Sequence, residues 1–486
     1  MADLPSVLSL SVLPCIHSVS SPDVLCRAFG MPRRDSRLVT PGDVYFCIRG
    51  RNHDGHTTLS DAILRGAACA VLDDPSYIGT AEAHSLPWVL VSDTAEAFLP
   101  ACLAYCGNPE RGMHLYAVTG TNGKTSVTYL LEAIFTAYDP GTPCAVFGTV
   151  ENRVAGVRSK TENTTPAPEV TSELLAYAHR RGVRHVFLEA SSHALAQHRL
   201  SGHRFDCGIF TNLGTDHLDY HETPEDYFLC KRSLFFACDR ALINTDDPHG
   251  RRLYEDPLLC GRAVSYTPRT NGGDYTLSFL PRDLTVAPAA FLAENRLAAA
   301  ACASMAGIPH SVIVRAIRSM PPIPGRMECV RRVPFSVYLD FAHTPDALRA
   351  ALSGLRAELE KTAEGAKLHV VFGCGGDRDR TKRPMMGLAA AEYADRIILT
   401  ADNSRSEATC DIIADILGGI PPEHLSKTVV IEDRRDAIRH ALCTASCGDT
   451  VLLAGKGHET SQTDRDGVHP FSERDIISDY FSENDP

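Results

Sequence analysis

Hydrophobic residues along the 486-residue chain gather in short apolar runs, each of which ends in polar residues. Residues 115–120 (LYAVTG) predict a strand that passes into a glycine-rich loop and then into a helix over residues 126–138. A strand, a glycine loop and a helix in this order are typical of a phosphate-binding βα unit. Residues 185–190 (HVFLEA) and 205–213 (FDCGIFTNL) predict further buried strands. Because open α/β sheets bind ligands at the carboxyl ends of their strands, we expect a ligand site there.

A second sheet is predicted beyond a proline-rich boundary near residues 321–330 (PPIPGRMECV). Strand-like runs alternate there with helical segments, which is typical of a doubly wound sheet. The strand-like runs are residues 336–343, 368–376, 395–403 and 450–457. The first 110 residues are mixed α/β, and the total length fits three domains of roughly 150 residues. We therefore expect an α/β protein with domains at 1–110, 111–327 and 328–486.

Composition narrows the class of protein. Hydrophobic residues make up 44% and charged residues 22% of the chain, an ordinary globular balance. The net charge of −12 disfavours binding to nucleic-acid phosphates. No apolar run approaches the ~18 residues that a transmembrane helix needs, and no basic residues precede the first apolar stretch as in a signal peptide. We expect a cytoplasmic protein that neither enters a membrane nor binds nucleic acid.

The seventeen cysteines do not form a recognisable framework. Their number is odd, and no CxxC pair is present. Disulfides and a zinc site are therefore disfavoured, and most of the cysteines are expected to be small buried hydrophobes.

The glycine-rich loop is the first candidate site. Its backbone N–H groups and the following helix could hold a triphosphate, with Lys124 at the β- and γ-phosphates and Thr125 on Mg²⁺. Position 118 is valine, whereas the strict motif has an earlier glycine, so an ordinary glycine turn is the alternative. The loop comprises Gly120, Thr121, Asn122, Gly123, Lys124 and Thr125.

Three further polar residues follow or interrupt apolar runs. Glu189 and His217 come after predicted strands of one sheet, where they could complete a Mg²⁺ shell around nucleotide phosphates. Capping or surface positions are the alternative for each of them. Lys231 interrupts an otherwise apolar helical stretch and by itself reads as a lysine whose head reaches the surface.

Positive charge concentrates in the last third of this acidic chain. A glycine-rich turn at residues 373–376 leads into a run of arginines, whose guanidinium forks suit carboxylates. A solvated basic surface is the alternative. The cluster comprises Arg378, Arg380, Lys382, Arg383 and Arg405.

Ten sequence strings, in order from residue 35 to residue 459, resemble the Mur ligase family, and within it the UDP-N-acetylmuramoyl-tripeptide synthetases. Each string alone is weak, but ten in order are specific. They are DSRLVTPGD, VTGTNGKTS, NTTPAPEV, EASSHALAQHRL, FTNLGTDHLDYH, PIPGRMECV, DFAHTPDAL, FGCGGDRDRTKRPMM, DNSRSE and AGKGHE.

The resemblance implies three domains: one that holds the uridine nucleotide, a central P-loop ATPase sheet and a Rossmann-like C-terminal domain for the incoming amino acid. It implies that ATP is bound by Gly120 to Ser126, Asn295, Arg326, Asp340 and His343. It places the UDP-linked substrate at Ser36, Arg51, Asn52, His53, Asn163, Thr164, Thr165, Ser191, Gln197 and Arg199. It assigns the amino acid to Arg378, Asp402, Asn403, Ser404, Arg405, Gly455 and Glu459.

The resemblance also reverses the interpretation of Lys231, which matches a lysine that the family carries as N-carboxylysine. Addition of CO₂ turns the cation into a carboxylate that can support a second Mg²⁺. The implied metal ligands are Thr125, Glu189, His217 and Lys231, and the implied catalytic residues are Lys124, Lys231, His217 and Glu189.

The implied reaction joins an amino acid to UDP-N-acetylmuramoyl-L-alanyl-D-glutamate through an acyl-phosphate made with ATP and Mg²⁺. Family members that use meso-diaminopimelate have the motif DNPR, whose arginine binds the distal carboxylate. This chain has DNSR at residues 402–405 and keeps the arginine. Meso-diaminopimelate is therefore favoured, while the serine leaves L-lysine and L-ornithine open.

Two other classes of function stay open at this stage. One is a sister ligase such as a folylpolyglutamate synthase, and the other is a non-catalytic nucleotide-binding protein that keeps the fold. We expect a monomer.

Overall fold

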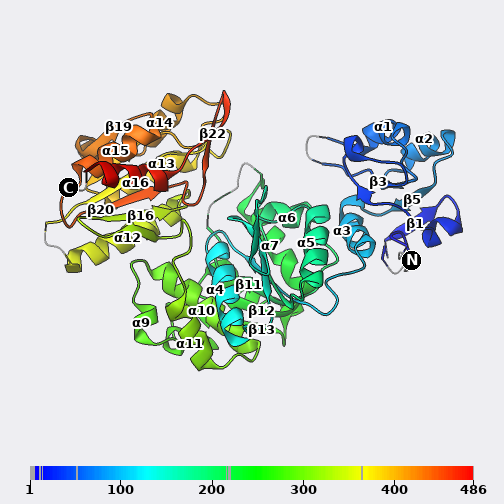
Figure 1. Cartoon of the computed structure of the whole chain (residues 1–486), viewed down its shortest axis with the longest axis horizontal. Coiled ribbons are helices and arrows are strands. Elements are labelled where there is room, and N and C mark those ends of the chain that lie inside the picture. The colour runs from blue at the N-terminus through cyan, green and yellow to red at the C-terminus, as the bar shows by residue number, and fades with distance from the viewer. Residues whose placement is uncertain are drawn as a thin grey trace.

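The computed structural model describes residues 6–9, 12–13, 15–50, 53–214, 216, 220–362 and 365–484. Three main sheets follow one another along the long axis of the molecule, and the two termini lie at opposite ends (Figure 1). The α/β fold class predicted from the sequence is confirmed. Among the described residues, no helix is long and apolar enough to cross a bilayer.

The N-terminal sheet has five strands in the order β1-β5-β4-β3-β2, with β1 antiparallel to β5 and the other neighbours parallel. Its strands are β1 (Ile16–Val19), β2 (Pro32–Arg33), β3 (Val44–Phe46), β4 (Cys69–Leu72) and β5 (Trp88–Val91). Its α-helices are α1 (Leu59–Leu64), α2 (Ile78–Ala83) and α3 (Thr94–Tyr105). Apolar clusters cover both faces of this sheet, which explains why β3 and β4 are apolar throughout.

The central sheet has nine strands in the order β14-β13-β12-β11-β6-β10-β7-β8-β9. Its strands are β6 (His114–Thr119), β7 (Cys144–Phe147), β8 (Asn152–Val154), β9 (Val157–Ser159), β10 (His185–Glu189), β11 (Phe205–Phe210), β12 (Cys238–Asn244), β13 (Ala263–Thr267) and β14 (Tyr275–Thr276). Seven of them run parallel, and β8 and β9 form an antiparallel edge.

Helices cover the central sheet on both sides, so each face has its own apolar core. They are α4 (Lys124–Tyr138), α5 (Pro168–Arg180), α6 (Ser192–Ala196), α7 (Pro224–Ser233), α8 (Pro248–Tyr254), α9 (Arg282–Thr285), α10 (Ala290–Met305) and α11 (His310–Ser319). The predicted strands at residues 115–120, 185–190 and 205–213 are confirmed as β6, β10 and β11, which lie side by side in the order β11-β6-β10.

The C-terminal sheet has six strands in the order β15-β16-β20-β17-β18-β19, of which only β15 is antiparallel to its neighbour. The strands are β15 (Glu328–Arg331), β16 (Ser336–Asp340), β17 (Leu368–Phe372), β18 (Arg396–Leu399), β19 (Thr428–Val430) and β20 (Thr450–Ala454). A hairpin of β21 (Ser461–Asp464) and β22 (Gly467–Pro470) follows. The helices are α12 (Pro345–Thr362), α13 (Lys382–Tyr393), α14 (Thr409–Leu417), α15 (Arg434–Thr444) and α16 (Glu473–Asn484).

All seventeen cysteines are free, as the absence of a framework predicted. Eight of them are buried and five are exposed, so the expectation that most are buried is wrong. Burial raises the pKa of the Cys144 and Cys374 thiols to about 12 each, so these two cysteines act as apolar packing residues.

Candidate active site

A cavity of about 760 Å³ lies where the strands of the central sheet end and the C-terminal sheet approaches. The glycine-rich loop and Glu189 line it from the central domain, and Asp340 and His343 line it from the C-terminal domain. The ligand site expected at the ends of β6, β10 and β11 thus coincides with a cleft shared by two sheets.

The shape of the glycine-rich loop depends on two glycines. Gly120 and Gly123 have φ angles of 152° and 88°. A Cβ on Gly120 would lie 1.9 Å from Thr211 Oγ1, and one on Gly123 would lie 2.5 Å from Asn295 Oδ1. The loop is anchored because the N–H of Thr121 donates to the carbonyl of Asn212 over 2.9 Å. The loop therefore reaches the N-terminus of α4 even though position 118 is valine and not glycine.

Two lysines converge on this loop, Lys124 half-buried and Lys231 fully buried. Lys124 Nζ donates to the carbonyls of Gly120 and Thr121 at 2.8 and 2.9 Å, and Lys231 Nζ donates to Gly120 O at 3.0 Å. Lys231 is only 1% exposed, so its interpretation as a surface lysine is wrong. Burial lowers the pKa of both lysines, and the charge of Lys124 lowers that of Lys231 further.

Glu189 ends β10 beside the first turn of α4. Its Oε2 accepts hydrogen bonds from the hydroxyls of Thr125 (3.0 Å) and Thr149 (2.8 Å), and its Oε1 accepts from the N–H of Thr149. Only glycine fits at position 148, because a Cβ there would lie 2.2 Å from Glu189 Oε1. Glu189 is therefore held in place by hydrogen bonds rather than acting as a helix cap.

The oxygens of Thr125 and Glu189 are ligands of the type that Mg²⁺ prefers. His217, the third ligand expected from the sequence, lies outside the described residues. Within the described residues, no group of three His, Cys, Asp or Glu side chains is arranged to hold a metal. Besides Glu189, a metal at this site would take its ligands from the Thr125 hydroxyl, from bound phosphates or from a modified Lys231.

A second cavity of about 180 Å³ adjoins the first and shares Asp216, Phe341 and His343 with it. Six of the seven residues expected to bind the amino acid line it: Arg378, Asp402, Asn403, Arg405, Gly455 and Glu459. Ser404 is buried and does not line it. Burial and the charge of Arg378 lower the pKa of Arg405, so an anion placed between the two guanidinium groups would be stabilised.

Arg405 has a left-handed backbone conformation, with a φ of 50°. Its N–H donates to Thr463 O over 3.1 Å, and its guanidinium donates to Gly376 O over 2.8 Å. The hairpin β21–β22 and the turn after β17 therefore hold Arg405 in the lining of the second cavity.

The basic cluster expected in this domain divides into two parts. Arg378, Lys382 and Arg405 line the second cavity. Arg383 is fully buried and forms ion pairs with Glu407 and Asp415, and Arg380 is exposed and pairs with Glu407. Treating all five as one binding cluster was therefore wrong, because acidic neighbours from the loop before α14 and from α14 itself neutralise two of them.

Residues expected to hold the UDP-linked substrate fall into two places. Thr165 accepts a hydrogen bond from the N–H of Ser191 (3.0 Å), and Arg199 donates to Thr165 O (3.0 Å) and to Gln197 Oε1 (2.7 Å). Thr164 and Ser191 also line the large cavity, while Asn163 is exposed nearby in the chain. The N-terminal domain carries the remaining ones: Ser36 is buried, His53 is exposed, and Arg51 and Asn52 lie outside the described residues.

Comparison with known proteins matches residues 118–279 to the Mur ligase middle domain and residues 325–457 to the Mur ligase glutamate ligase domain. A relative from Alkalilimnicola ehrlichii, named UDP-N-acetylmuramoyl-L-alanyl-D-glutamate–2,6-diaminopimelate ligase, is 39% identical over 91% of this chain and 93% of its own. The chain belongs to the Mur ligase family.

Two further comparisons agree with the membership of this chain in the Mur ligase family. A relative of the same name from Geobacillus kaustophilus is 37% identical over 96% of this chain and 97% of its own. A solved structure of a ligase with that name is 28% identical, with a TM-score of 0.64 over 98% of both chains. The likeness extends over all three sheets and is not confined to the nucleotide-binding one.

The remaining residues expected at ATP surround the large cavity of this Mur ligase. Asn295, Arg326, Asp340 and His343 all line it. Arg326 lies over the ring of Phe341, 4.5 Å from its centre, and donates to Thr125 Oγ1 over 3.1 Å. Arg326 thus links the C-terminal domain to the start of α4, and burial lowers its pKa.

Sequence reasoning missed two charged residues, one lining both cavities and one buried behind the second. Asp216 lies 3.8 Å from His343 Nε2 and 3.9 Å from Lys382 Nζ, between the central and C-terminal domains. Lys456 is fully buried and donates to Asn403 Oδ1 (3.0 Å) and Ser461 O (2.9 Å). Both residues stand inside strings that carried the resemblance, but their spacing along the chain gave no sign of these contacts.

Proposed function

We propose that this Mur ligase joins meso-diaminopimelate to UDP-N-acetylmuramoyl-L-alanyl-D-glutamate at the expense of ATP. The observation that carries the proposal is the pair of adjoining cavities, one lined by a phosphate-type loop and the other by two arginines. Relatives with more than 90% coverage of the chain carry the name of this activity, which favours it over a sister ligase.

The glycine-rich loop and Lys124 would hold the triphosphate of ATP in the large cavity. The terminal carboxylate of the UDP-linked dipeptide attacks the γ-phosphorus, an acyl-phosphate forms and ADP leaves. Lys124 and Arg326 lie where they can neutralise charge on the transferred phosphoryl group. Mg²⁺, held by Thr125 and Glu189 with His217 and a modified Lys231, would supply further charge neutralisation.

The amine of the incoming diamino acid then attacks the acyl carbon, and phosphate is the leaving group. Arg378 and Arg405 would bind the distal carboxylate of meso-diaminopimelate, and Glu459 and Asp402 would bind an ammonium group. L-lysine and L-ornithine have no second carboxylate and would leave the two guanidinium groups without an anion. Because acyl-phosphates hydrolyse readily, the region where the two cavities adjoin must exclude water during the reaction.

Lys231 is proposed to react with CO₂ through its uncharged amine. A bond forms between Nζ and the carbon of CO₂, and the amine releases a proton. Burial lowers the pKa of the Lys231 amine and so favours its uncharged form.

The same proposal assigns the uridine nucleotide to residues 1–110, ATP to residues 111–327 and the amino acid to residues 328–486. The proposal also includes that the protein is a monomer in the cytoplasm.

Isotope transfer tests the reaction course. The dipeptide substrate is prepared with ¹⁸O in its terminal carboxylate and incubated with ATP, Mg²⁺ and meso-diaminopimelate. The proposal expects one ¹⁸O atom in each phosphate released and a UDP-tripeptide as product, both measured by mass spectrometry. Phosphate without ¹⁸O would contradict the acyl-phosphate, and ATP binding without turnover would indicate a non-catalytic nucleotide-binding protein instead.

A further inference from the structure

Lys456 is a fully buried lysine just after β20, and it lines neither of the two cavities. Its Nζ donates to Asn403 Oδ1 over 3.0 Å, to Ser461 O over 2.9 Å and to Glu459 Oε2 over 3.3 Å. All three N–H groups of the ammonium therefore have an acceptor, which a buried cation needs. The reaction described above assigns no role to Lys456.

Two glycines flank Lys456, and one of them brings a second carboxylate close to it. Gly455 and Gly457 have positive φ angles of 110° and 56°. A Cβ on Gly455 would lie 2.5 Å from Asp402 Oδ2, so only glycine lets Asp402 come this near. Asp402 Oδ1 lies 3.9 Å from Lys456 Nζ. The buried charge of Lys456 is thus close to both Asp402 and Glu459, which line the second cavity.

Lys456 fixes the direction in which the amide of Asn403 points. Asn403 Oδ1 accepts from Lys456 Nζ and also from the N–H of Thr463 over 2.9 Å. A reversed amide would turn its NH2 group toward both of these donors, and an NH2 group cannot accept a hydrogen bond from either. Nδ2 is therefore the amide atom that meets Glu459, and it donates to Glu459 Oε2 over 3.0 Å.

The carboxylate of Glu459 is oriented by the same contacts. Asn403 Nδ2 and Lys456 Nζ both donate to its Oε2. All hydrogen bonds that the described residues donate to this carboxylate end on Oε2, and the side chain keeps 31% of its surface exposed. Oε1 is therefore available to an ammonium group that enters the second cavity, which Glu459 and Asn403 both line.

Strand β21 is hydrogen-bonded to the loop at residues 402–405, and Lys456 contacts both. Ser461 O in β21 accepts from Lys456 Nζ, and Thr463 O accepts from the N–H of Arg405 over 3.1 Å. The loop, the hairpin and the end of β20 therefore share one buried cation as a common hydrogen-bond donor.

We infer that Lys456 positions Asn403 and Glu459 to bind an ammonium group of the incoming diamino acid. This rests on the proposed function, which places that amino acid in the second cavity. Lys456 lines neither cavity and is therefore a positioning residue. A carboxylate that is already oriented binds its partner without first losing rotamer freedom, so the inference concerns affinity for the diamino acid and not the chemical step.

The test uses the full-length enzyme with Lys456→Met and Lys456→Gln. Methionine has no donor, whereas the glutamine amide can still donate to Asn403 Oδ1. Lys456→Met is expected to raise the KM for the diamino acid roughly tenfold and Lys456→Gln less, because the first loses every hydrogen bond of the ammonium and the second keeps one. The kcat and the KM values for ATP and the UDP-dipeptide should stay unchanged. Initial rates are measured with whichever of meso-diaminopimelate, L-lysine and L-ornithine the wild-type enzyme uses.

A double-mutant cycle with Asn403→Ala separates positioning from a general structural role. Asn403→Ala removes the amide that Lys456 orients and should raise the same KM. If Lys456 acts through this amide, the KM of the double variant should rise by clearly less than the product of the two single increases. Thermal unfolding is recorded for each variant, and Lys456→Gln takes the place of Lys456→Met in the cycle if the methionine variant does not fold.

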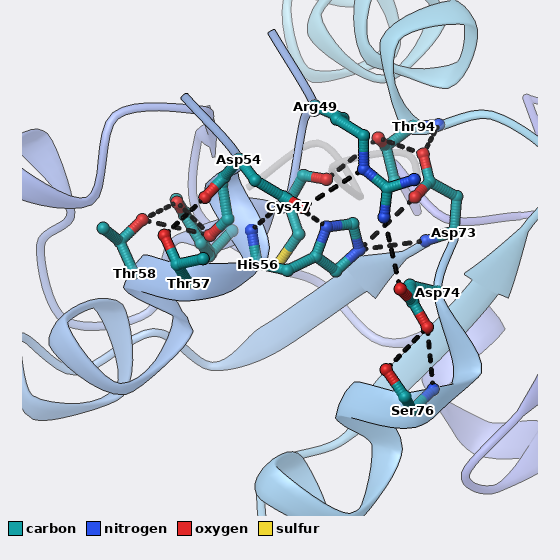
Figure 2. Close-up of polar contacts among 12 residues, drawn as sticks. Cys47, Arg49, Asp54, His56, Thr57, Thr58, Asp73, Asp74, Ser76 and Thr94 are labelled. Atoms are coloured by element: carbon teal, nitrogen blue, oxygen red, sulfur yellow. Dashed lines mark hydrogen bonds and ion pairs between the residues drawn. The ribbon is translucent and has the colours of Figure 1, made fainter. Parts of the chain in front are cut away.

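Two variants control for the loss of a lysine and of a buried polar contact elsewhere. Lys427 is half-buried in the same domain and donates to two backbone carbonyls over 2.7 Å each. His56 is buried in the N-terminal domain, where its imidazole lies between the carboxylates of Asp54 and Asp73 (Figure 2). Lys427→Met and His56→Asn should leave the KM for the diamino acid unchanged.

Each result decides between the two ideas. If the wild-type enzyme ligates a diamino acid but both Lys456 variants keep the wild-type KM for it, the positioning role is wrong and the proposed function stands. Increases that multiply in the double variant would show that Lys456 does not act through Asn403, and they would equally overturn the inference. If kcat and all three KM values change together, Lys456 serves only folding and the inference is wrong. If the wild-type enzyme shows no turnover with any of the three diamino acids, the proposed function fails and the inference falls with it.

Discussion

The glycine-rich loop and the arginine-lined second cavity of this Mur ligase are built on different principles. In the glycine-rich loop, backbone conformation determines the shape of the site. Two glycines with positive φ angles let the chain pass Thr211 and Asn295 and present the N-terminus of α4. In the second cavity, side-chain charge determines what can bind. Arg378 and Arg405 line this cavity from turns that follow β17 and β18. Substitutions should therefore harm the two regions in different ways.

Removal of the loop lysine should have the largest effect. Lys124→Ala takes away the cation that donates to the carbonyls of Gly120 and Thr121, and we expect ligation to fall by roughly three orders of magnitude or more. Phosphate release measures this loss. Lys361→Ala, which removes an exposed lysine of α12, is the control and should behave as wild type. Near-normal ligation by Lys124→Ala would refute the loop assignment.

Removal of the buried Lys231 should lower activity severely, and the loss should be partly reversible. Lys231→Ala is expected to lower kcat by about two to three orders of magnitude, since a carboxylate at the phosphates would be lost. Formate or acetate should restore part of the activity to the alanine variant and none to Lys124→Ala. The absence of rescue would leave the carboxylated lysine without support.

A single methyl group tests whether the backbone shapes the loop. Gly120→Ala places a Cβ 1.9 Å from Thr211 Oγ1, so the loop must shift, and kcat/KM should fall by roughly two orders of magnitude. The control is Gly112→Ala: Gly112 also has a positive φ, 89°, but a Cβ there would contact nothing. Equal losses in the two variants would show that backbone strain and not the clash is responsible.

A change in the charge geometry of the second cavity should alter only one of the KM values. Arg405→Lys keeps the charge but loses the planar fork, so the KM for meso-diaminopimelate should rise about ten- to a hundredfold while the KM for ATP stays constant. Initial rates at varied concentrations of each substrate measure both. A rise in the KM for ATP of the same size would mean that the two cavities are not separate binding regions.

The smallest effect is expected at Ser404. The contacts that fix Arg405 come from its own N–H and guanidinium group, so Ser404→Pro should leave the KM for meso-diaminopimelate within about twofold of wild type. Thermal unfolding of the same variant controls for folding. A large loss of affinity would show that the serine itself sets the geometry of Arg405.

The difference between the two regions also explains what the sequence could predict. The strands β6, β10 and β11 were predicted closely, because parallel strands covered on both faces are continuous apolar runs. The helix α4 begins at Lys124, two residues before the predicted start, since the left-handed Gly123 begins it. Patterns of this kind depend only on residues that are neighbours in the sequence.

Buried charged and polar residues could not be predicted in the same way. Lys231 is buried by the packing of α7 against the glycine-rich loop, and Arg383 is neutralised by Glu407 and Asp415 from elsewhere in the chain. His56 and Lys456 are likewise satisfied by residues that only the tertiary fold brings close. The resemblance located Lys231 correctly, whereas residue physics alone put it at the surface.

Phosphate release with UDP-N-acetylmuramoyl-L-alanyl-D-glutamate and each diamino acid in turn tests the central claim most directly. The account predicts ATP turnover with meso-diaminopimelate and little with L-lysine or L-ornithine, because only the first supplies an anion for Arg378 and Arg405. Turnover with lysine or ornithine would keep the ligase and contradict the role given to the arginines. No turnover with any of the three would contradict the proposed function itself.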